Sequence, residues 1–219
     1  MRYYPAFLDL QGKRCVVVGG GAVAARKAEA LLRAGGLVRV VAPEIGPEMR
    51  RLCGRPKARR GSPQQPPRKV EWHRARYSAR DLDGAWLVLA ATNEARVHEA
   101  VGRDAAERGL LCNLADSAAG SNFLAPAAFC RGDLQVAVST CGAAPALARR
   151  VRRELEKMLG PEYGQLLALL RELRSRVMAC VPAGRRRQQF RRMVNSTALD
   201  LLRQDRREEA RRVLESFCP

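Results

Sequence analysis

The residues best suited to chemistry in this chain form a glycine turn. Gly19 and Gly21 precede Ala24 in the spacing Gly-x-Gly-x-x-Ala, directly after the apolar run Cys15–Val18. In a dinucleotide-binding turn the first glycine permits a tight bend, the second lets the backbone approach a pyrophosphate, and the small third residue lets the helix pack closely on the strand. The N-terminus of the following helix offers N–H groups and a positive dipole end to the phosphates. The pattern predicts a nucleotide site; the alternative is a purely structural glycine turn.

Asp116 is the candidate catalytic residue, because it follows the apolar run 110–115. Ligands of parallel sheets bind beyond the carboxyl ends of the strands, and a carboxylate placed there can accept a proton. The alternative role of Asp116 is to cap a turn together with Ser117. The two histidines, His73 and His98, have no partner visible in the sequence, so we expect neither to be catalytic. No cluster has the spacing of metal ligands, so no metal site is predicted.

The elements that would position these residues alternate between strands and helices, as is typical of an α/β fold. Short, mainly apolar runs predict the strands, and longer segments that end at glycine predict the helices. The predicted strands are 14–18, 37–42, 70–73, 86–91 and 110–115, and the predicted helices are 22–34 and 94–108. We expect the strands to form one Rossmann-type parallel sheet.

Two more candidate cofactor residues follow predicted strands. Glu44 lies about twenty residues beyond the glycine turn, where an acid often holds the ribose hydroxyls, although Pro43 before it makes the geometry unusual. Thr92 follows the strand 86–91. Because ligands lie at the carboxyl ends of the strands, we expect Thr92 beside the nucleotide.

After Asp116 the alternation stops. The runs 123–127 and 134–140 predict strands, with a turn signal at Gly132-Asp133 between them, and the segment 141–145 is predicted to open a helical tail. Helical spacing in this tail is carried by Leu166, Leu169, Leu170, Leu173 and Val177. Residues 53–70 are rich in proline, glycine, glutamine and arginine, and they predict a flexible surface insertion.

The composition is strongly basic, with a formal net charge of +18 in 219 residues. Such a charge suits nucleic acid, a membrane surface or an anionic small ligand, and the alternative is biased residue usage on solvated helix faces. Aromatic residues do not alternate with the basic ones, so we expect no nucleic-acid partner. No apolar run approaches the roughly 18 to 20 residues of a membrane span. The N-terminus lacks the apolar core of a signal peptide, and the seven scattered cysteines form no C-x-x-C pair, so we expect a cytoplasmic protein with reduced thiols.

Five sequence blocks, taken together and in order, resemble a known family. The blocks are Pro5-x-Phe7-Leu8-x-Leu10; Val17-Val18-Gly19-Gly20-Gly21-x-Val23-Ala24-x-Arg26-Lys27; Ala90-Ala91-Thr92-Asn93; Cys112-Asn113-Leu114-Ala115-Asp116 with Phe123 and Pro126; and Val136-Ala137-Val138-Ser139 with Pro145-Ala146-Leu147-Ala148-Arg149. They resemble the dehydrogenase/ferrochelatase module of siroheme synthase. The likeness covers about residues 3–160 well and the tail loosely.

The resemblance implies an NAD-dependent precorrin-2 dehydrogenase that forms sirohydrochlorin. Some members of the family then insert ferrous iron, so ferrous iron is a candidate second substrate. The implied fold is an NAD-binding Rossmann domain over 1–114, a small β-containing dimerisation and active-site region over 115–146, and a helical C-terminal domain over 147–219. The implied assembly is a homodimer.

The resemblance also assigns roles to residues. It implies that Asp116 is catalytic, that Ala22, Val23, Pro43 and Glu44 contact NAD with Gly19, Gly21 and Thr92, and that Ser121, Asn122 and Thr140 are candidate substrate residues. Relatives carry Ser-Ser-Gly-Gly where this chain has Ser139-Thr140-Cys141-Gly142, which leaves the role of Thr140 open. The implied tetrapyrrole carries eight carboxylates, and an arginine-rich cleft would attract and orient them.

Two other functions fit parts of the sequence. A regulatory domain could sense NAD without chemistry, in which case Asp116 would be structural and no tetrapyrrole would bind. A basic nucleic-acid-binding protein is suggested by the charge alone, and its affinity for DNA would fall steeply with rising salt.

Overall fold

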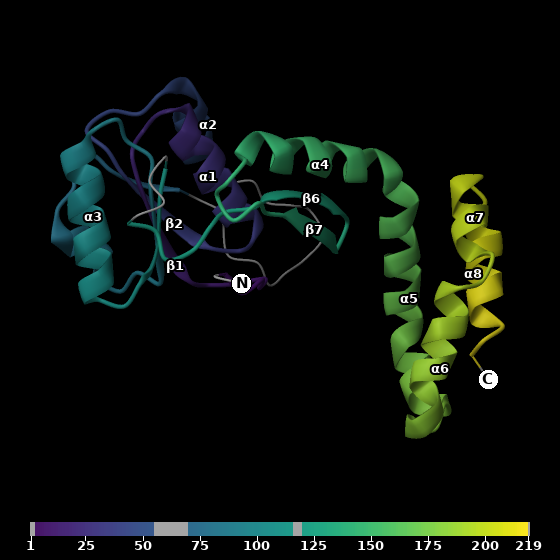
Figure 1. Ribbon diagram of the computed structural model, residues 1–219. Helices are drawn as coiled ribbons and strands as arrows, with labels where there is room; N and C mark the ends of the chain where they lie inside the picture. Colours follow the sequence, from purple (N-terminus) through teal and green to yellow (C-terminus); the bar gives the residue numbers. More distant parts are fainter. Residues whose placement is uncertain (1–2, 55–69, 116–119, 219) are drawn as a thin grey trace. The chain divides into compact units, whose positions relative to one another are not determined.

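A computed structural model describes residues 3–54, 70–115 and 120–218 of the chain. Asp116 and residues 55–69 of the predicted insertion therefore lie outside the described residues. The chain divides into two compact units, Met1–Ala125 and Pro126–Pro219 (Figure 1). The finer division at 114 and 146 stays a prediction.

The first unit is built on a five-stranded parallel sheet in the order β3-β2-β1-β4-β5. Its strands are β1 (Arg14–Val18), β2 (Leu37–Val41), β3 (Glu71–His73), β4 (Leu87–Ala90) and β5 (Leu111–Leu114). Residues Cys15–Val18 of β1 are all buried, because both faces of the sheet are covered. This is the predicted Rossmann-type sheet, and all five predicted strands are confirmed to within one residue at each end.

Helices cover the two faces of this sheet (Figure 1). The helical elements are α1 (Ala22–Arg33), α2 (Pro47–Cys53), the 3-10 turn η1 (Ala79–Leu82) and α3 (Ala95–Glu107). On one face, Leu31 of α1 and Met49 of α2 pack in the core that contains Val17. On the other face, Val101 of α3 packs in the core that contains Val16. Alternate residues of one strand therefore serve two cores.

The second unit consists of an antiparallel hairpin and five helices. The hairpin strands are β6 (Ala127–Arg131) and β7 (Leu134–Val138), and the helices are α4 (Pro145–Met158), α5 (Pro161–Cys180), α6 (Ala183–Val194), α7 (Ala198–Arg203) and α8 (Arg207–Glu215). The last four helices enclose a separate core. That core includes Leu166, Leu169, Leu173 and Val177, so the predicted helical spacing is confirmed.

Arg131 joins the hairpin to the end of α4. Its Nε donates to the carbonyl of Leu159 at 2.9 Å, and Nη2 donates to the carbonyl of Glu156 at 2.8 Å. These carbonyls belong to the last turn of α4, where the helix itself supplies no donors. Gly164 of α5 lies against the same arginine, since a Cβ at Gly164 would stand 2.5 Å from the Arg131 carbonyl oxygen.

Some sequence predictions were wrong in detail. The strand predicted over 123–127 begins only at Ala127, because Pro126 has no N–H to donate to a ladder. The strand predicted over 134–140 ends at Val138, whereas the helical tail, predicted to open over 141–145, begins at Pro145 as expected. The helix α2 and the turn η1 were not predicted.

The two end residues of the predicted insertion 53–70 belong to packed structure and not to a flexible segment. Cys53 closes α2, and the side chain of Val70 is 1% exposed in the core of the first unit. Among the described residues, no helix is both long and apolar enough to cross a bilayer.

Candidate nucleotide site

Two of the glycines in the turn are required by packing. Gly19 has a φ of +125°, and a Cβ there would lie 2.2 Å from the carbonyl oxygen of Ala91 after β4. A Cβ at Gly20 would lie 2.0 Å from the carbonyl oxygen of Glu44 after β2. The turn is thus held by backbone contact with the ends of both strands that flank β1. In this sheet order, the crevice beside β1 is where dinucleotides bind.

Gly21 differs from its two neighbours, because a Cβ built on it would meet nothing within 4 Å. It is the N-cap of α1, and because glycine has no side chain, no side-chain hydrogen bond caps this end of the helix. The first helical bond runs from the N–H of Ala25 to the carbonyl of Gly21, at 3.0 Å. The N–H groups of Ala22 and Val23 therefore have no acceptor within the helix, and both residues are exposed. This open helix start fits a pyrophosphate.

Pro43 and Glu44 are exposed in the loop after β2. The Glu44 backbone rests on Gly20, and the N–H of Gly46 donates to the Gly20 carbonyl at 2.9 Å. Glu44 therefore stands beside the glycine turn, where an acid can accept hydrogen bonds from ribose hydroxyls.

Thr92 is partly buried beside Gly19, and its hydroxyl oxygen accepts a hydrogen bond from within its own loop. Thr92 Oγ1 accepts a hydrogen bond from the N–H of Glu94 at 3.2 Å. The Thr92 N–H lies 3.4 Å from Nε2 of His98 on α3, which can accept its hydrogen. The two side chains shape the loop between β4 and α3, and the predicted contact of Thr92 with the nucleotide stays a prediction.

His73 also has a partner that the sequence analysis missed. Its Nδ1 lies 2.8 Å from Oδ1 of Asp81, a carboxylate that is only 3% exposed. The other oxygen of Asp81 accepts hydrogen bonds from the N–H and the hydroxyl of Ser78. The spacing Ser-x-x-Asp is that of a capping box, and this signal could have predicted both η1 and the buried acid.

Near the carboxyl end of β5, the described residues include a lysine that the sequence analysis did not select. Lys27 of α1 donates from Nζ to Oδ1 of Asn113 at 2.8 Å, and Asn113 donates from Nδ2 to the carbonyl of Phe123 at 3.1 Å. The amide is thereby fixed in one orientation, and it ties α1 to β5. Asp116 follows three residues later, outside the described residues.

The side chains of Ser121 and Asn122 form hydrogen bonds with the backbone of the edge strand β5. Ser121 Oγ accepts from the N–H of Leu114 at 2.9 Å, and Asn122 Oδ1 accepts from the N–H of Cys112 at 2.8 Å. Asn122 Nδ2 also donates to the carbonyl of Leu110 at 2.7 Å. These side chains take the place of a neighbouring strand. Their predicted contact with substrate stays a prediction.

Thr140, the third candidate substrate residue, belongs to the second unit. Its Oγ1 accepts from the N–H of Ala144 at 3.1 Å, and its carbonyl accepts from the N–H of Ala143 at 3.0 Å. Cys141 after it has a φ of +54°. Thr140 thus organises the turn that leads into α4.

Burial shifts the pKa of several ionisable groups in the first unit. It raises the pKa of the Cys15 thiol and of the Cys112 thiol from 9.0 to about 11 each, so both keep their protons well above neutral pH. Burial, together with a hydrogen bond to Asp104, also raises the pKa of Tyr77. The described residues contain no group of three or more His, Cys, Asp or Glu side chains that could hold a metal ion.

Three family models match the chain in succession. The model described as "Putative NAD(P)-binding" matches residues 6–127, the sirohaem biosynthesis protein central model matches 131–158, and the sirohaem synthase dimerisation region matches 162–216. The chain belongs to this NAD(P)-binding family of sirohaem biosynthesis proteins. The family resemblance inferred from the sequence blocks is therefore confirmed.

Curated relatives and a solved structure agree with this membership. A siroheme synthase of Chromobacterium violaceum is 41% identical over 190 residues, which are 87% of this chain and 38% of the relative. Siroheme synthase 3 of Aeromonas hydrophila is 38% identical over 200 residues, which are 91% of this chain and 40% of the relative. The chain thus spans about two fifths of the length of these relatives. The structure of "SirC, precorrin-2 dehydrogenase" matches 98% of this chain and 100% of its own, with a TM-score of 0.76 and 26% identity.

Proposed function

We propose that this chain oxidises precorrin-2 to sirohydrochlorin, with NAD as the hydride acceptor, in siroheme biosynthesis. The observation that carries the proposal is the match to a precorrin-2 dehydrogenase over nearly the whole of both chains. The open start of α1 at Gly21 supports it independently, because it offers a place for the pyrophosphate that such a reaction needs.

Different residues of the first unit bind the cofactor and take part in the reaction. The N–H groups of Ala22 and Val23 bind the pyrophosphate, and Glu44 accepts hydrogen bonds from a ribose. Bound NAD supplies the acceptor for a hydride from the tetrapyrrole. Oxidation of the substrate removes one hydride and one proton, and the Asp116 carboxylate accepts that proton. The Lys27–Asn113 bond holds α1 against the strand that leads to Asp116.

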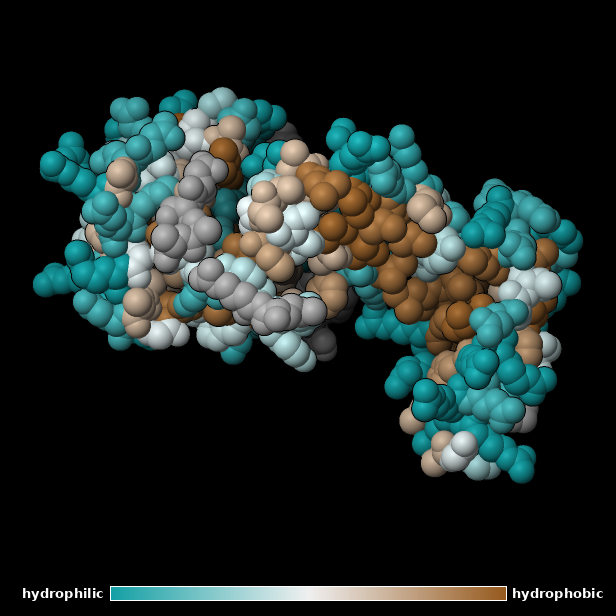
Figure 2. Space-filling model, in the orientation of Figure 1, coloured by the Kyte–Doolittle hydropathy of each residue, from teal (hydrophilic) through white to brown (hydrophobic). Residues whose placement is uncertain are grey.

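The substrate and the assembly fit the charge and the surface of the chain. A tetrapyrrole with eight carboxylates is attracted by a chain of net charge +18. Figure 2 shows hydrophobic residues gathered on the second unit around α4 and the start of α5. Leu147 and Met158 of α4 are 51% and 71% exposed. We propose that a second copy of the chain covers this surface in a homodimer, in keeping with the dimerisation region matched over 162–216. A cytoplasmic location fits the seven free cysteines.

An absorbance assay tests the proposal. Precorrin-2 is mixed with the protein and NAD, and the appearance of NADH and of sirohydrochlorin is followed. We expect both to rise together. Binding of NAD without oxidation would support the regulatory alternative and refute the enzyme. Ferrous iron is then added, and conversion of sirohydrochlorin to siroheme reports whether the chain also inserts the metal.

A further inference from the structure

A shallow pocket of about 410 Å³ lies on the helical part of the second unit, and most of its residues fall within the dimerisation region matched over 162–216. Its walls are formed by Gln188, Arg191, Arg192, Asn195, Ser196 and Phe217. The volume is within the range of small-molecule sites, which is roughly 300 to 1,000 Å³.

The pocket is lined mainly by one face of α6 and the residues just after it. Gln188, Arg191, Arg192 and Asn195 follow the spacing i, i+3, i+4, i+7, which brings side chains to the same side of a helix. The sequence of α6, AGRRRQQFRRMV, contains five arginines and no acidic residue. Two guanidinium groups and two amides therefore share this face without a carboxylate from their own helix.

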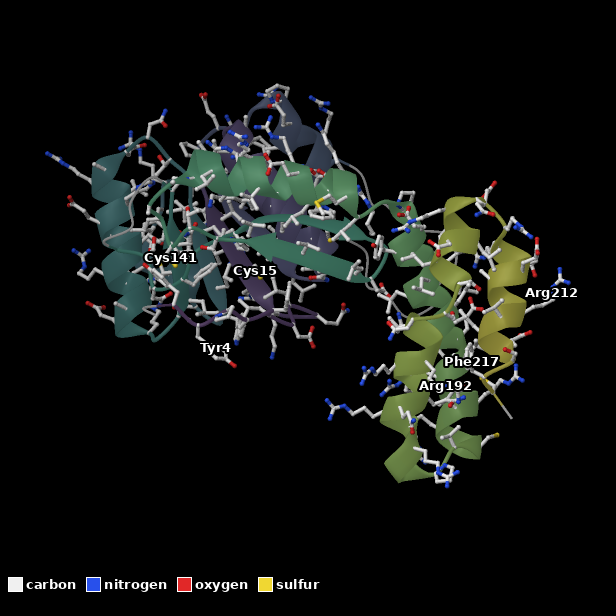
Figure 3. All side chains as sticks on the ribbon, turned by 45° about the vertical axis from the view of Figure 1, so that its right-hand side comes forward. Tyr4, Cys15, Cys141, Arg192, Arg212 and Phe217 are labelled. Carbon is white, nitrogen blue, oxygen red and sulfur yellow. The ribbon has the colours of Figure 1, made fainter. Side chains whose placement is uncertain are left out.

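Phe217, from the C-terminal segment, closes the pocket. The side chain of Gln189 donates a hydrogen bond to the Phe217 carbonyl and so fixes this segment to α6. The Arg192 guanidinium lies over the Phe217 ring, 5.5 Å from its centroid, and Figure 3 shows the two side chains close together. Such stacking uses the flat face of the guanidinium and leaves its N–H edge for an acceptor.

The charge of the pocket is not neutralised by the described residues. Neither Arg191 nor Arg192 forms an ion pair with a carboxylate in the described part of the chain, although other arginines of the same unit do. Those paired arginines are Arg131, Arg150, Arg152, Arg171, Arg176, Arg203, Arg206 and Arg211. Placing both unpaired guanidiniums in the concave site makes it electropositive.

We propose that this pocket binds a small organic anion with two or three negative charges, whose carboxylate or phosphate groups pair with Arg191 and Arg192. A planar guanidinium pairs with either group through two parallel hydrogen bonds. Asn195 and Gln188 offer additional donors at the rim, and the Phe217 ring offers an apolar wall. A dianion matches the two cations at the site.

Isothermal titration calorimetry on the full chain tests the proposal, with neither NAD nor tetrapyrrole present, so its outcome is independent of the proposed function. The probes are citrate and inorganic phosphate, which distinguish a polycarboxylate from a phosphate ligand, and chloride at the same ionic strength. We expect saturable binding of one citrate or phosphate per chain. Arg191→Gln should weaken it about tenfold or more, because it removes a charge-assisted hydrogen bond.

Arg187→Gln is the matched control, since Arg187 loses the same charge on the same helix but does not line the pocket. We expect it to leave binding unchanged. Equal weakening by Arg187→Gln and Arg191→Gln, equal displacement by chloride, or no saturable binding of either probe would overturn the proposal. Within the described residues, Arg191 makes no ring contact of the kind that Arg192 makes with Phe217. The test therefore uses Arg191→Gln and not Arg192→Gln, because Arg192→Gln would also remove the contact with the Phe217 ring.

Discussion

One tight contact in each unit joins neighbouring elements, and the two contacts differ in kind. In the first unit, the glycine turn packs backbone on backbone, with Gly19 against Ala91 and Gly20 against Glu44. In the second unit, an arginine side chain joins the hairpin to the end of α4. Backbone packing leaves a signature that can be read in the sequence, namely glycines after a buried strand. Arginine contacts leave no such signature, because a sequence does not distinguish an arginine that joins two elements from one that lies in solvent.

The two units also differ in the functional features that they carry. The first unit carries the open helix start that fits a nucleotide, and the second carries the hydrophobic surface and the dimerisation region. Changes at Asp116 and at the open helix start should therefore alter chemistry, whereas changes at the packing contacts of either unit should alter stability. The following predictions test this division.

The largest effect is expected at Asp116. Asp116→Asn keeps the shape of the side chain and a turn-capping oxygen, but it removes the proposed proton acceptor. We expect precorrin-2 oxidation to fall by about 10²- to 10⁴-fold while NAD binding is unchanged. Steady-state rates and calorimetric NAD binding measure the two quantities. Full oxidation by this variant would make Asp116 a structural residue.

Gly20→Ala tests whether the turn depends on backbone packing. A Cβ at Gly20 would collide with the Glu44 carbonyl, so we expect the free energy of unfolding to fall by about 2–4 kcal/mol. Gly21→Ala is the control, because its Cβ would meet no atom within 4 Å. Urea unfolding of the full chain compares the two. Similar stabilities would show that the tight contact at Gly20 does not matter.

Arg131→Met tests the corresponding contact of the second unit. The substitution keeps much of the apolar stem but leaves the carbonyls of Glu156 and Leu159 without their donor. We expect a loss of about 1–3 kcal/mol in the free energy of unfolding, measured in urea. Arg187→Met, on an exposed position of α6, should have little effect. If both variants lose the same amount, general charge and not this contact explains the result.

A further prediction concerns pH. Burial raises the pKa of Cys15 from 9.0 to about 11, so between these values the unfolded thiol loses its proton while the folded one keeps it. The stabilising contribution of this thiol is complete below pH 9.0 and is lost as the pH rises toward 11. Unfolding free energies measured across this window should fall more steeply in the parent than in Cys15→Ala. Parallel curves would contradict the burial of this thiol.

Much of the first unit could be predicted from sequence. The strands were found because both faces of the sheet are buried, which makes each strand a short, mainly apolar run, as in Leu37–Val41. The helix α2 was missed because only Met49 in it is buried, so seven residues carry no periodic signal. The strand predicted over 123–127 was misplaced because apolar composition was given more weight than the missing N–H of Pro126.

The candidate site was harder to predict, because its polar residues have other partners. Ser121 and Asn122 resemble ligand-binding residues in the sequence, yet their side chains satisfy the edge of β5. Lys27 and Asn113, 86 residues apart, meet only in the folded chain. Position on a strand end can be read from a sequence, but the partner of a polar side chain depends on the tertiary structure.

The central claim is that this chain oxidises precorrin-2 with NAD bound at the glycine turn of its first unit. The most direct test is the number of NADH molecules formed per precorrin-2 consumed, in the parent, in Gly21→Val and in the control Gly184→Val. A Cβ at either glycine would meet open space, so both variants should fold. We expect one NADH per precorrin-2 in the parent and in Gly184→Val, and loss of NAD binding and of NADH formation in Gly21→Val, whose side chain occupies the place of the pyrophosphate. Undiminished NADH formation by a folded Gly21→Val protein, or oxidation without NADH in the parent, would contradict the claim.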